Sequence, residues 1–225
     1  RMLAANVRVG GEPVVMPVRE RRVTERPLVV LCDVSGSMER YSRMLLHFVH
    51  CLTGGQHQRA GRLGRVEAFL FATRLTRITH EMRQRGADHA VSQVVRGLSD
   101  WAGGTRIGEA LRTFNVQWAR RVTGRAPVIL LISDGWDRGD PERLRQEMAR
   151  LSRSAWRLIW LNPLLGSPDY QPLTRGMQAA LPYVDDFLPV HNLVSLERLA
   201  AALNQLPAGR RGQTQLTRKW ASVLR

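Results

Sequence analysis

Two uninterrupted apolar runs, residues 28–32 and 128–132, constrain the fold more than any other feature of the sequence. A strand that is apolar at every position has both faces buried, as in a parallel sheet that helices cover on both sides. Each run ends in a short polar turn and is followed by apolar residues at helical spacing. Further strands are expected over 66–71, 74–79, 156–161 and 187–190. This alternation predicts a doubly wound α/β fold with a mainly parallel sheet and helices on both faces.

Helix signals lie between the expected strands. Apolar residues recur at helical spacing from Met38 onward and again in the segments 91–98, 107–118 and 196–203. Asp140 is followed by Pro141 and Glu142, which is a strong helix start because aspartate caps free N–H groups and proline fits the first turn. We expect Asp88 and Ser195 to cap their helices in the same way.

The length of 225 residues allows one large domain or two small ones. We expect a basic N-terminal segment over 1–27, one domain over 28–206 and a basic tail over 207–225. The tail has five basic residues, no acidic ones and little apolar periodicity, so we expect it to be loosely held and dispensable for the fold. The chain opens at Arg1, and we expect a further N-terminal region before it.

The charge balance is strongly basic, with 34 basic residues against 19 acidic ones and a net charge of +15. Lys219 is the only lysine, so a phosphate-binding Gly-Lys-Ser/Thr triplet is absent from the sequence and lysine-based covalent catalysis is disfavoured. Arginine binds carboxylates and phosphates but does not transfer protons. The composition therefore favours an acidic partner, which leaves an acidic protein, nucleic acid and peripheral contact with an anionic membrane open.

The sequence indicates a protein of the cytoplasm, or of the inner face of the cytoplasmic membrane. No apolar run approaches the roughly 18 residues of a membrane-spanning helix. Residues 1–11 lack the apolar core of a signal peptide. Cys32 and Cys51 have no CxxC spacing, so we expect both to be buried small apolar residues in a reducing compartment.

Oxygen-bearing side chains gather in three turns at expected strand ends or helix starts. They are Asp33, Ser35 and Ser37 after the first apolar run, Thr105 before a helix, and Asp134 after the second apolar run. In a doubly wound fold the ligand lies at the carboxyl ends of the strands. Carboxylate and hydroxyl oxygens suit Mg²⁺ best here, with Mn²⁺ or Ca²⁺ as alternatives, and they disfavour zinc and copper. The pattern predicts a divalent cation site.

Each segment also has a simpler interpretation when it is considered alone. Ser35 or Ser37 could cap the helix that begins near Met38, and Thr105 could cap the helix that follows it. The Asp134-Gly135 pair is also ordinary turn chemistry. The metal interpretation rests on the three segments together.

The set Asp33-x-Ser35-x-Ser37, Thr105 and Asp134 resembles the metal-ion-dependent adhesion site of von Willebrand factor type A (VWA) domains. The resemblance covers roughly residues 26–206 and implies a Rossmann-like VWA fold. The wider phrases at 32–38, 103–111, 132–140 and 160–164 resemble the CoxE-like family of bacterial VWA proteins.

The resemblance implies a non-enzymatic adaptor that acts with a MoxR-type AAA+ ATPase in the maturation of carbon monoxide dehydrogenase or a related metalloenzyme. The ion would keep an open position for an acidic residue of a partner or client. Arg106, Trp136 and Asp137 border the motif segments, and we expect them to form the partner-binding rim, with Asp137 as a turn residue or an outer acceptor.

Three other functions are compatible with parts of this sequence. The same module could serve another AAA+ system, such as one that activates a carbon-fixing enzyme. RNA binding is allowed by the charge but disfavoured, because only 6% of the residues are aromatic and they form no base-stacking cluster. A metal-dependent hydrolase is disfavoured, because the three segments contain no histidine and no Asp-x-Asp nucleophile motif.

Overall fold

A computed structural model describes residues 26–54, 63–84, 86–96, 104–122, 126–167, 169–204, 213–214 and 217–218. Its strands form one six-stranded sheet in the order β3-β2-β1-β4-β5-β6. Only β3 is antiparallel to its neighbour, and the other pairs are parallel. The strands are β1 (Arg26–Asp33), β2 (Leu63–Phe71), β3 (Leu75–Arg77), β4 (Val128–Ile132), β5 (Arg157–Asn162) and β6 (Asp186–Pro189). The expected doubly wound, mainly parallel sheet is confirmed.

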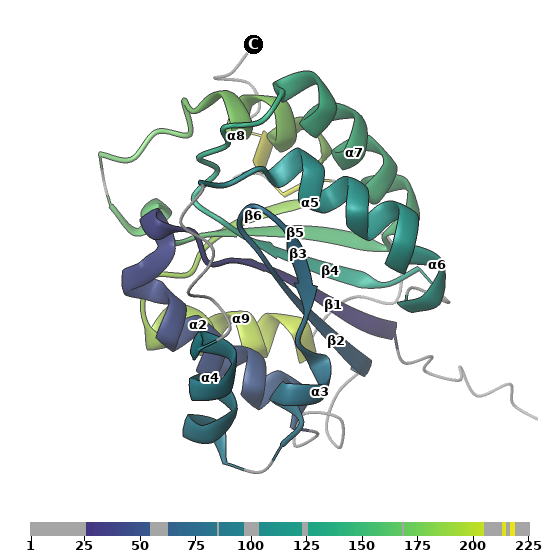
Figure 1. Ribbon diagram of the computed structural model, residues 1–225. Coiled ribbons are helices and arrows are strands. Elements are labelled where there is room, and N and C mark those ends of the chain that lie inside the picture. Colours follow the sequence, from purple (N-terminus) through teal and green to yellow (C-terminus); the bar gives the residue numbers. More distant parts are fainter. Residues whose placement is uncertain are drawn as a thin grey trace, which may run out of the picture.

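Helices cover both faces of this sheet (Figure 1). One layer contains α2 (Glu39–Thr53), α3 (Thr79–Met82), α4 (Ala87–Arg96) and α9 (Leu193–Asn204). The other layer contains α5 (Ile107–Thr113), α6 (Ala119–Val122), α7 (Pro141–Ser154) and α8 (Arg175–Ala180). A π-helical segment, Phe114–Trp118, joins α5 to α6.

The apolar strands fill two cores, one on each side of the sheet. Alternate residues of β1 point to opposite faces, so Leu28 and Val30 pack in the core under α2 and α9, and Val29 and Leu31 pack under α5 and α7. Every residue of β4 is fully buried. This explains why the two runs that are apolar at every position became the central strands.

Two expected helix caps are wrong, and one is confirmed. Asp140 accepts a hydrogen bond from Glu142 N at 3.0 Å at the start of α7, as predicted. Asp88 lies within the first turn of α4, where its carboxylate faces Arg43 and His47 instead. Ser195 also lies inside its helix, because Asn192 Oδ1 accepts from Ser195 N at 2.8 Å and takes the capping role.

Cys32 is fully buried, as expected, whereas Cys51 is exposed near the end of α2. Among the helices that the structure describes, none combines the length and apolar character needed to cross a bilayer. The domain boundaries stay predictions, because residues 1–25 and most of the tail lie outside the described residues.

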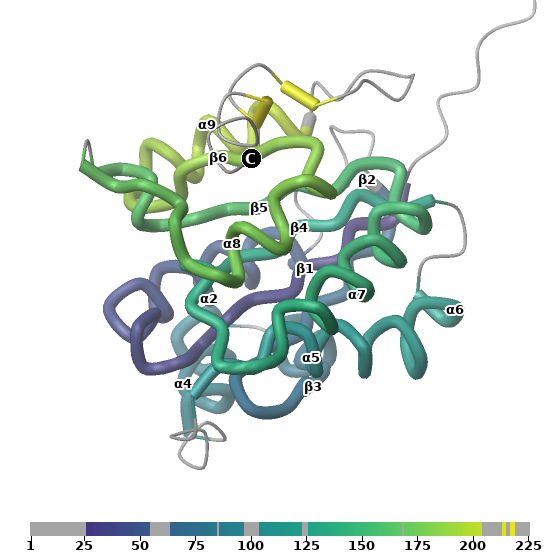
Figure 2. The backbone as a smooth tube through the Cα atoms, turned by 90° about the horizontal axis from the view of Figure 1, so that it is seen from above, coloured from purple at the N-terminus to yellow at the C-terminus, as the bar shows by residue number. Residues whose placement is uncertain are grey.

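Two short described segments of the tail, 213–214 and 217–218, pack beside the edge strand β6, and for these residues the expectation of a loosely held tail is wrong. Thr217 is fully buried, and its Oγ1 accepts a hydrogen bond from Phe187 N at 2.9 Å. Thr214 N donates to Asp185 O at 3.0 Å. These short segments lie next to β6 when the molecule is seen from above (Figure 2). They satisfy backbone groups at the open edge of the sheet.

We therefore expect truncation after Pro207 to lower the free energy of unfolding by about 1–3 kcal/mol, because buried backbone groups of β6 lose their partners. Chemical denaturation of the full and truncated chains measures this effect. Thr217→Val is the matched variant, because it removes the acceptor of the Phe187 N–H and keeps the side-chain shape. An unchanged unfolding free energy in both variants would restore the view that the tail is dispensable.

Candidate metal centre

The expected site lies where the order of the strands reverses. β1 has β2 on one side and β4 on the other, and Cys32 pairs with Ile132 in parallel register. The segments that follow these residues therefore leave the same edge of the sheet side by side. This is the topological switch point at which doubly wound folds bind ligands.

Asp33 is buried at the centre of this edge. Its Oδ1 accepts a hydrogen bond from Ser35 N at 2.9 Å, and its Oδ2 accepts one from Ser133 Oγ at 2.7 Å. Burial raises the pKa of the Asp33 carboxyl to about 7; the hydrogen bonds from Ser35 and Ser133 oppose this shift and the nearby Asp134 charge adds to it. A cation placed beside the carboxylate would favour its ionised form.

Ser35 and Ser37 bring their hydroxyl groups together instead of capping a helix. Their Oγ atoms lie 3.2 Å apart. The short 3-10 turn Gly36–Met38 and the helix α2 both begin without a side-chain cap hydrogen bond. Ser35 is buried and Ser37 is exposed. The capping interpretation of these two serines is therefore wrong.

Thr105 lies in the loop before α5 and is not the cap of that helix either. The free N–H of Ile107 is accepted by Asp137 Oδ1 at 2.9 Å, so a carboxylate from another loop takes this role. Thr105 O accepts from Arg138 N at 2.9 Å, which ties the two loops together. The Thr105 side chain is buried, and its hydroxyl makes no hydrogen bond within the described ranges.

Asp134 supports both interpretations of its segment. Its Oδ1 accepts from Trp136 N at 2.9 Å, which is the expected turn chemistry. Its Oδ2 makes no hydrogen bond to the described part of the chain. The turn requires Gly135, because its φ is +81° and a Cβ there would overlap Met177 Sδ.

A cleft of about 790 Å³ opens above these residues. Its walls are formed by the segments of the motif and by the loop before α8: Ser35, Gly36, Ser37, Gly104, Thr105, Trp136, Asp137, Arg138, Leu173, Thr174 and Arg175. Within the described residues, no three His, Cys, Asp or Glu side chains gather as a metal-binding group. The donor set is therefore rich in hydroxyl groups and poor in carboxylates, which fits a hard cation that keeps water or a foreign ligand.

Trp136 and Asp137 line the cleft, while Arg106 is exposed and is absent from its walls. Asp137 Oδ1 accepts from Ile107 N and from Gly139 N, so Asp137 is a turn residue that also holds the start of α5. Its Oδ2 is buried and has no hydrogen-bond partner among the described residues. Burial raises the pKa of the Asp137 carboxyl, with the two backbone hydrogen bonds opposing the shift and the charges of Asp140 and Glu109 adding to it.

Residues that the sequence did not single out hold the site in place. Ser133 Oγ donates to Asp33 and accepts from Gly135 N. Asn162 Nδ2, at the end of β5, donates to Asp134 O at 3.2 Å and contacts Tyr170. Thr174 Oγ1 donates to Gly135 O at 3.0 Å. Only their position in the sequence could have indicated this role, because Ser133 and Asn162 each directly follow an expected strand.

Comparison with known proteins places the chain within one family. The model of the family described as VWA domain containing CoxE-like protein matches residues 1–196. No protein of curated function matches the chain in sequence.

Several solved structures share the fold at low sequence identity. A von Willebrand factor type A structure from Catenulispora acidiphila is 14% identical, with a TM-score of 0.56 over 81% of this chain and 42% of that chain. Proximal thread matrix protein 1 from the mussel byssus is 15% identical, with a TM-score of 0.53 over 80% of this chain and 47% of that chain. A second structure of that mussel protein, with a TM-score of 0.50 at the same identity and coverage, has a zinc-occupied metal-ion-dependent adhesion motif. The chain spans less than half the length of these structures.

Proposed function

Because the chain belongs to the family of VWA domain containing CoxE-like proteins, we propose that it is a non-enzymatic, metal-ion-dependent adaptor. It joins a MoxR-type AAA+ ATPase to a client, carbon monoxide dehydrogenase or a related metalloenzyme under maturation. The alternative is an adaptor of another AAA+ activation system, which would use the same metal-dependent contact with an acidic residue. We place its action in the cytoplasm or at the inner face of the cytoplasmic membrane.

The observation that carries the proposal is the pair of serine hydroxyls at 3.2 Å, which neither helix start uses. With Thr105, whose hydroxyl is also unused by the described residues, they give three hydroxyl oxygens beside two buried aspartates. The three hydroxyl-bearing residues line one cleft, and none of their side chains caps a helix start. A bound cation would give these hydroxyl oxygens a partner.

Asp33, Ser35, Ser37, Thr105 and Asp134 would hold a divalent cation, with Mg²⁺ as our assignment. The zinc in the mussel protein shows that a motif of this type can take a divalent ion in that protein. The hard oxygen donors of this chain favour Mg²⁺ over zinc. A cation with so few direct carboxylates keeps net positive charge, and an acidic side chain of the partner completes its coordination.

The described residues that line the cleft include no histidine that could act as a general base, which supports binding over catalysis. The carboxylate of Asp137 is already engaged at Oδ1 by two backbone N–H groups. Asp137 therefore fixes the start of α5 at the wall of the cleft, and it would not bind the ion directly. Arg106, exposed beside Thr105, is available to pair with the partner's acidic residue.

Affinity for the MoxR-type ATPase in Mg²⁺ and in EDTA tests this proposal. We expect EDTA to weaken the complex at least tenfold, or about 1.4 kcal/mol. Thr105→Ala in Mg²⁺ should bind like the wild type in EDTA and should keep its fold, because the Thr105 hydroxyl makes no hydrogen bond within the described ranges. Arg106→Gln should weaken binding less, because the metal contact remains.

Thr76→Ala, on the edge strand β3 and exposed, is the matched control and should bind like the wild type. Equal affinity in Mg²⁺ and EDTA, with Thr105→Ala unchanged, would make the cluster structural and refute the adaptor role of the ion. Binding of mixed RNA at physiological salt that ignores Mg²⁺ would favour the RNA alternative.

A further inference from the structure

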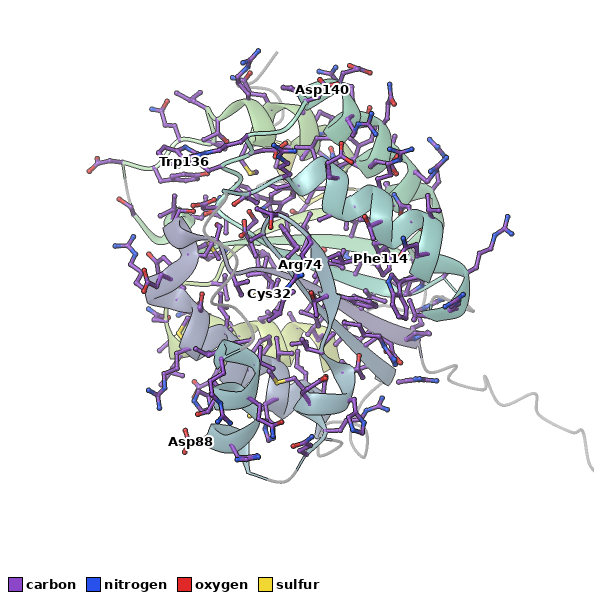
Figure 3. All side chains as sticks on the ribbon, in the orientation of Figure 1. Cys32, Arg74, Asp88, Phe114, Trp136 and Asp140 are labelled. Carbon is purple, nitrogen blue, oxygen red and sulfur yellow. The ribbon has the colours of Figure 1, made fainter. Side chains whose placement is uncertain are left out.

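Two large apolar side chains are exposed on the cleft above the candidate metal centre. Trp136 is 67% exposed and Leu173 is 54% exposed, and both line this cleft. Figure 3 shows Trp136 on the side of the sheet where α7 begins, far from Asp88 on α4. Tryptophan is the residue type that most often carries binding energy in protein interfaces. An exposed tryptophan beside a polar site therefore indicates a surface that binds a ligand.

The loops that present these side chains are fixed rather than free. Trp136 N is held by Asp134 Oδ1 at 2.9 Å, and Gly135 O is held by Thr174 Oγ1 at 3.0 Å. Thr174 directly follows Leu173 and Gly135 directly precedes Trp136, so this hydrogen bond connects the two loops that carry the apolar side chains. A preorganised apolar surface loses little conformational entropy on binding.

The same cleft carries positive charge that the described part of the chain does not neutralise. Arg138 and Arg175 line the cleft and are exposed, and no carboxylate of the described residues forms an ion pair with either. On α7, in contrast, Arg143, Arg145 and Arg150 each face a glutamate. Arg138 also packs over Gly104, where a Cβ would come within 2.8 Å of its Cδ, and both residues line the cleft.

We propose that this cleft binds an acidic segment of a partner protein in which a large apolar residue neighbours the metal-binding carboxylate. The inference rests on the proposed function, because the carboxylate reaches the ion held by the motif. The apolar residue packs on Trp136 and Leu173, and further acidic residues pair with Arg138 and Arg175. A single carboxylate would fill only a small part of about 790 Å³, whereas several residues of a segment fit this volume.

A displayed library of random 12-residue peptides tests the proposal directly. The library is applied to the immobilised protein in Mg²⁺, and bound peptides are then eluted with EDTA. We expect the eluted sequences to be enriched in Asp or Glu next to Leu, Ile, Phe, Met or Trp. Trp136→Ser should reduce the apolar preference at least about fivefold, because it removes the larger apolar surface. Val116→Ser is the matched control, because Val116 is 64% exposed on a remote helix and its loss should change nothing.

A labelled peptide from the enriched set then gives affinities by fluorescence anisotropy. We expect Arg175→Gln to weaken binding about threefold to tenfold, as loss of a charge-assisted contact does. Arg112→Gln, exposed on α5, is its control and should bind like the wild type. The Arg175 effect should also shrink in high salt.

The possible outcomes separate this inference from the proposed function. Peptides that elute with EDTA but lack an apolar neighbour, or that Trp136→Ser selects equally well, would overturn the inference and leave the metal-dependent adaptor standing. Peptides with the acidic and apolar pattern that elute in high salt but not in EDTA would support this surface and refute the role of the ion. If light scattering gave a dimer for the wild type and a monomer for Trp136→Ser, a second copy of the chain would be the occupant of the cleft and the inference would be wrong.

Discussion

Replacing Asp33 by asparagine is expected to weaken Mg²⁺ binding at least about a hundredfold while the metal-free protein stays as stable as the wild type. Several kcal/mol separate a charged from a neutral neighbour of a divalent ion at the effective permittivity of a half-buried site, and a hundredfold corresponds to about 2.8 kcal/mol. Asparagine keeps the shape, so its oxygen can accept from Ser35 N and its amide can donate to Ser133 Oγ. It also removes a buried charge that the fold must desolvate.

Calorimetry with Mg²⁺ and thermal unfolding with and without the ion measure the two effects together. An ion that binds only the folded state raises the unfolding free energy by about 2.7 kcal/mol at a hundred times its Kd. We expect this gain in the wild type and at most about 0.4 kcal/mol in Asp33→Asn at the same Mg²⁺ concentration, because a hundredfold weaker site is then only half occupied.

Asp88→Asn is the control, because it removes the same charge from an exposed position on α4 (Figure 3). It should leave Mg²⁺ binding unchanged. If Asp33→Asn bound Mg²⁺ like the wild type, the ion would bind elsewhere and the assignment of the five residues would be wrong. If it lost binding only because it unfolded, the thermal transition in EDTA would show this.

The central strands could be predicted from the sequence because burial alone decides them. β1 and β4 lie inside the sheet with helices on both faces, so each position must be apolar and the run is visible without any partner. The Asp140 cap was equally visible, because all of its signals lie within three consecutive residues. Local chemistry and fold agree at these places.

The wrong caps show that a local sequence pattern does not decide which residue caps a helix. Ser195 has the side chain of a cap, but Asn192 captures its N–H and the helix begins earlier, at Leu193. Thr105 was a candidate cap for α5, yet Asp137 from a loop 30 residues later reaches that N–H first. Helix starts depend on which acceptor the incoming loops supply, and a periodic pattern holds no information about those loops.

The candidate site divides in the same way. Asp33, Ser35, Ser37 and Asp134 could be expected at one edge, because parallel strands bring their carboxyl ends together, whereas Thr105 precedes a helix and follows no strand directly. The supporting contacts could not be predicted, since Ser133 contacts Asp33 across 100 residues and Asn162 contacts Asp134 across 28. The carboxylate pair Asp185-Asp186 is a second case that its local sequence does not explain: Asp186 is buried against the buried Arg157, and Asp185 Oδ2 accepts from Leu158 N.

That buried pair sets the largest expected effect on stability. Arg157 begins β5 and Asp186 begins β6, and they form a two-point contact through Nε with Oδ2 and through Nη2 with Oδ1, the latter at 2.7 Å. We expect Asp186→Ala to lower the free energy of unfolding by about 3–5 kcal/mol, because it leaves the guanidinium buried without a counter-charge. Glu142→Gln, which breaks the exposed pair with Arg145, should cost less than about 1 kcal/mol.

The double variant Arg157→Met/Asp186→Leu should recover most of that loss, because it removes both desolvated charges together. Arg157 Nη1 is buried and already lacks a partner among the described residues, so its removal relieves a cost that the wild type carries. Urea unfolding of Arg157→Met, Asp186→Leu and the double variant measures the coupling. Additive losses would mean that the two charges do not depend on each other. The pair lies at the amino ends of β5 and β6, whereas two of the proposed metal ligands, Asp33 and Asp134, lie at or just after the carboxyl ends of β1 and β4. The double variant should therefore bind Mg²⁺ like the wild type, whereas Asp33→Asn should weaken Mg²⁺ binding without a loss of stability. If the double variant bound Mg²⁺ more weakly than the wild type, this separation of fold and function would be wrong.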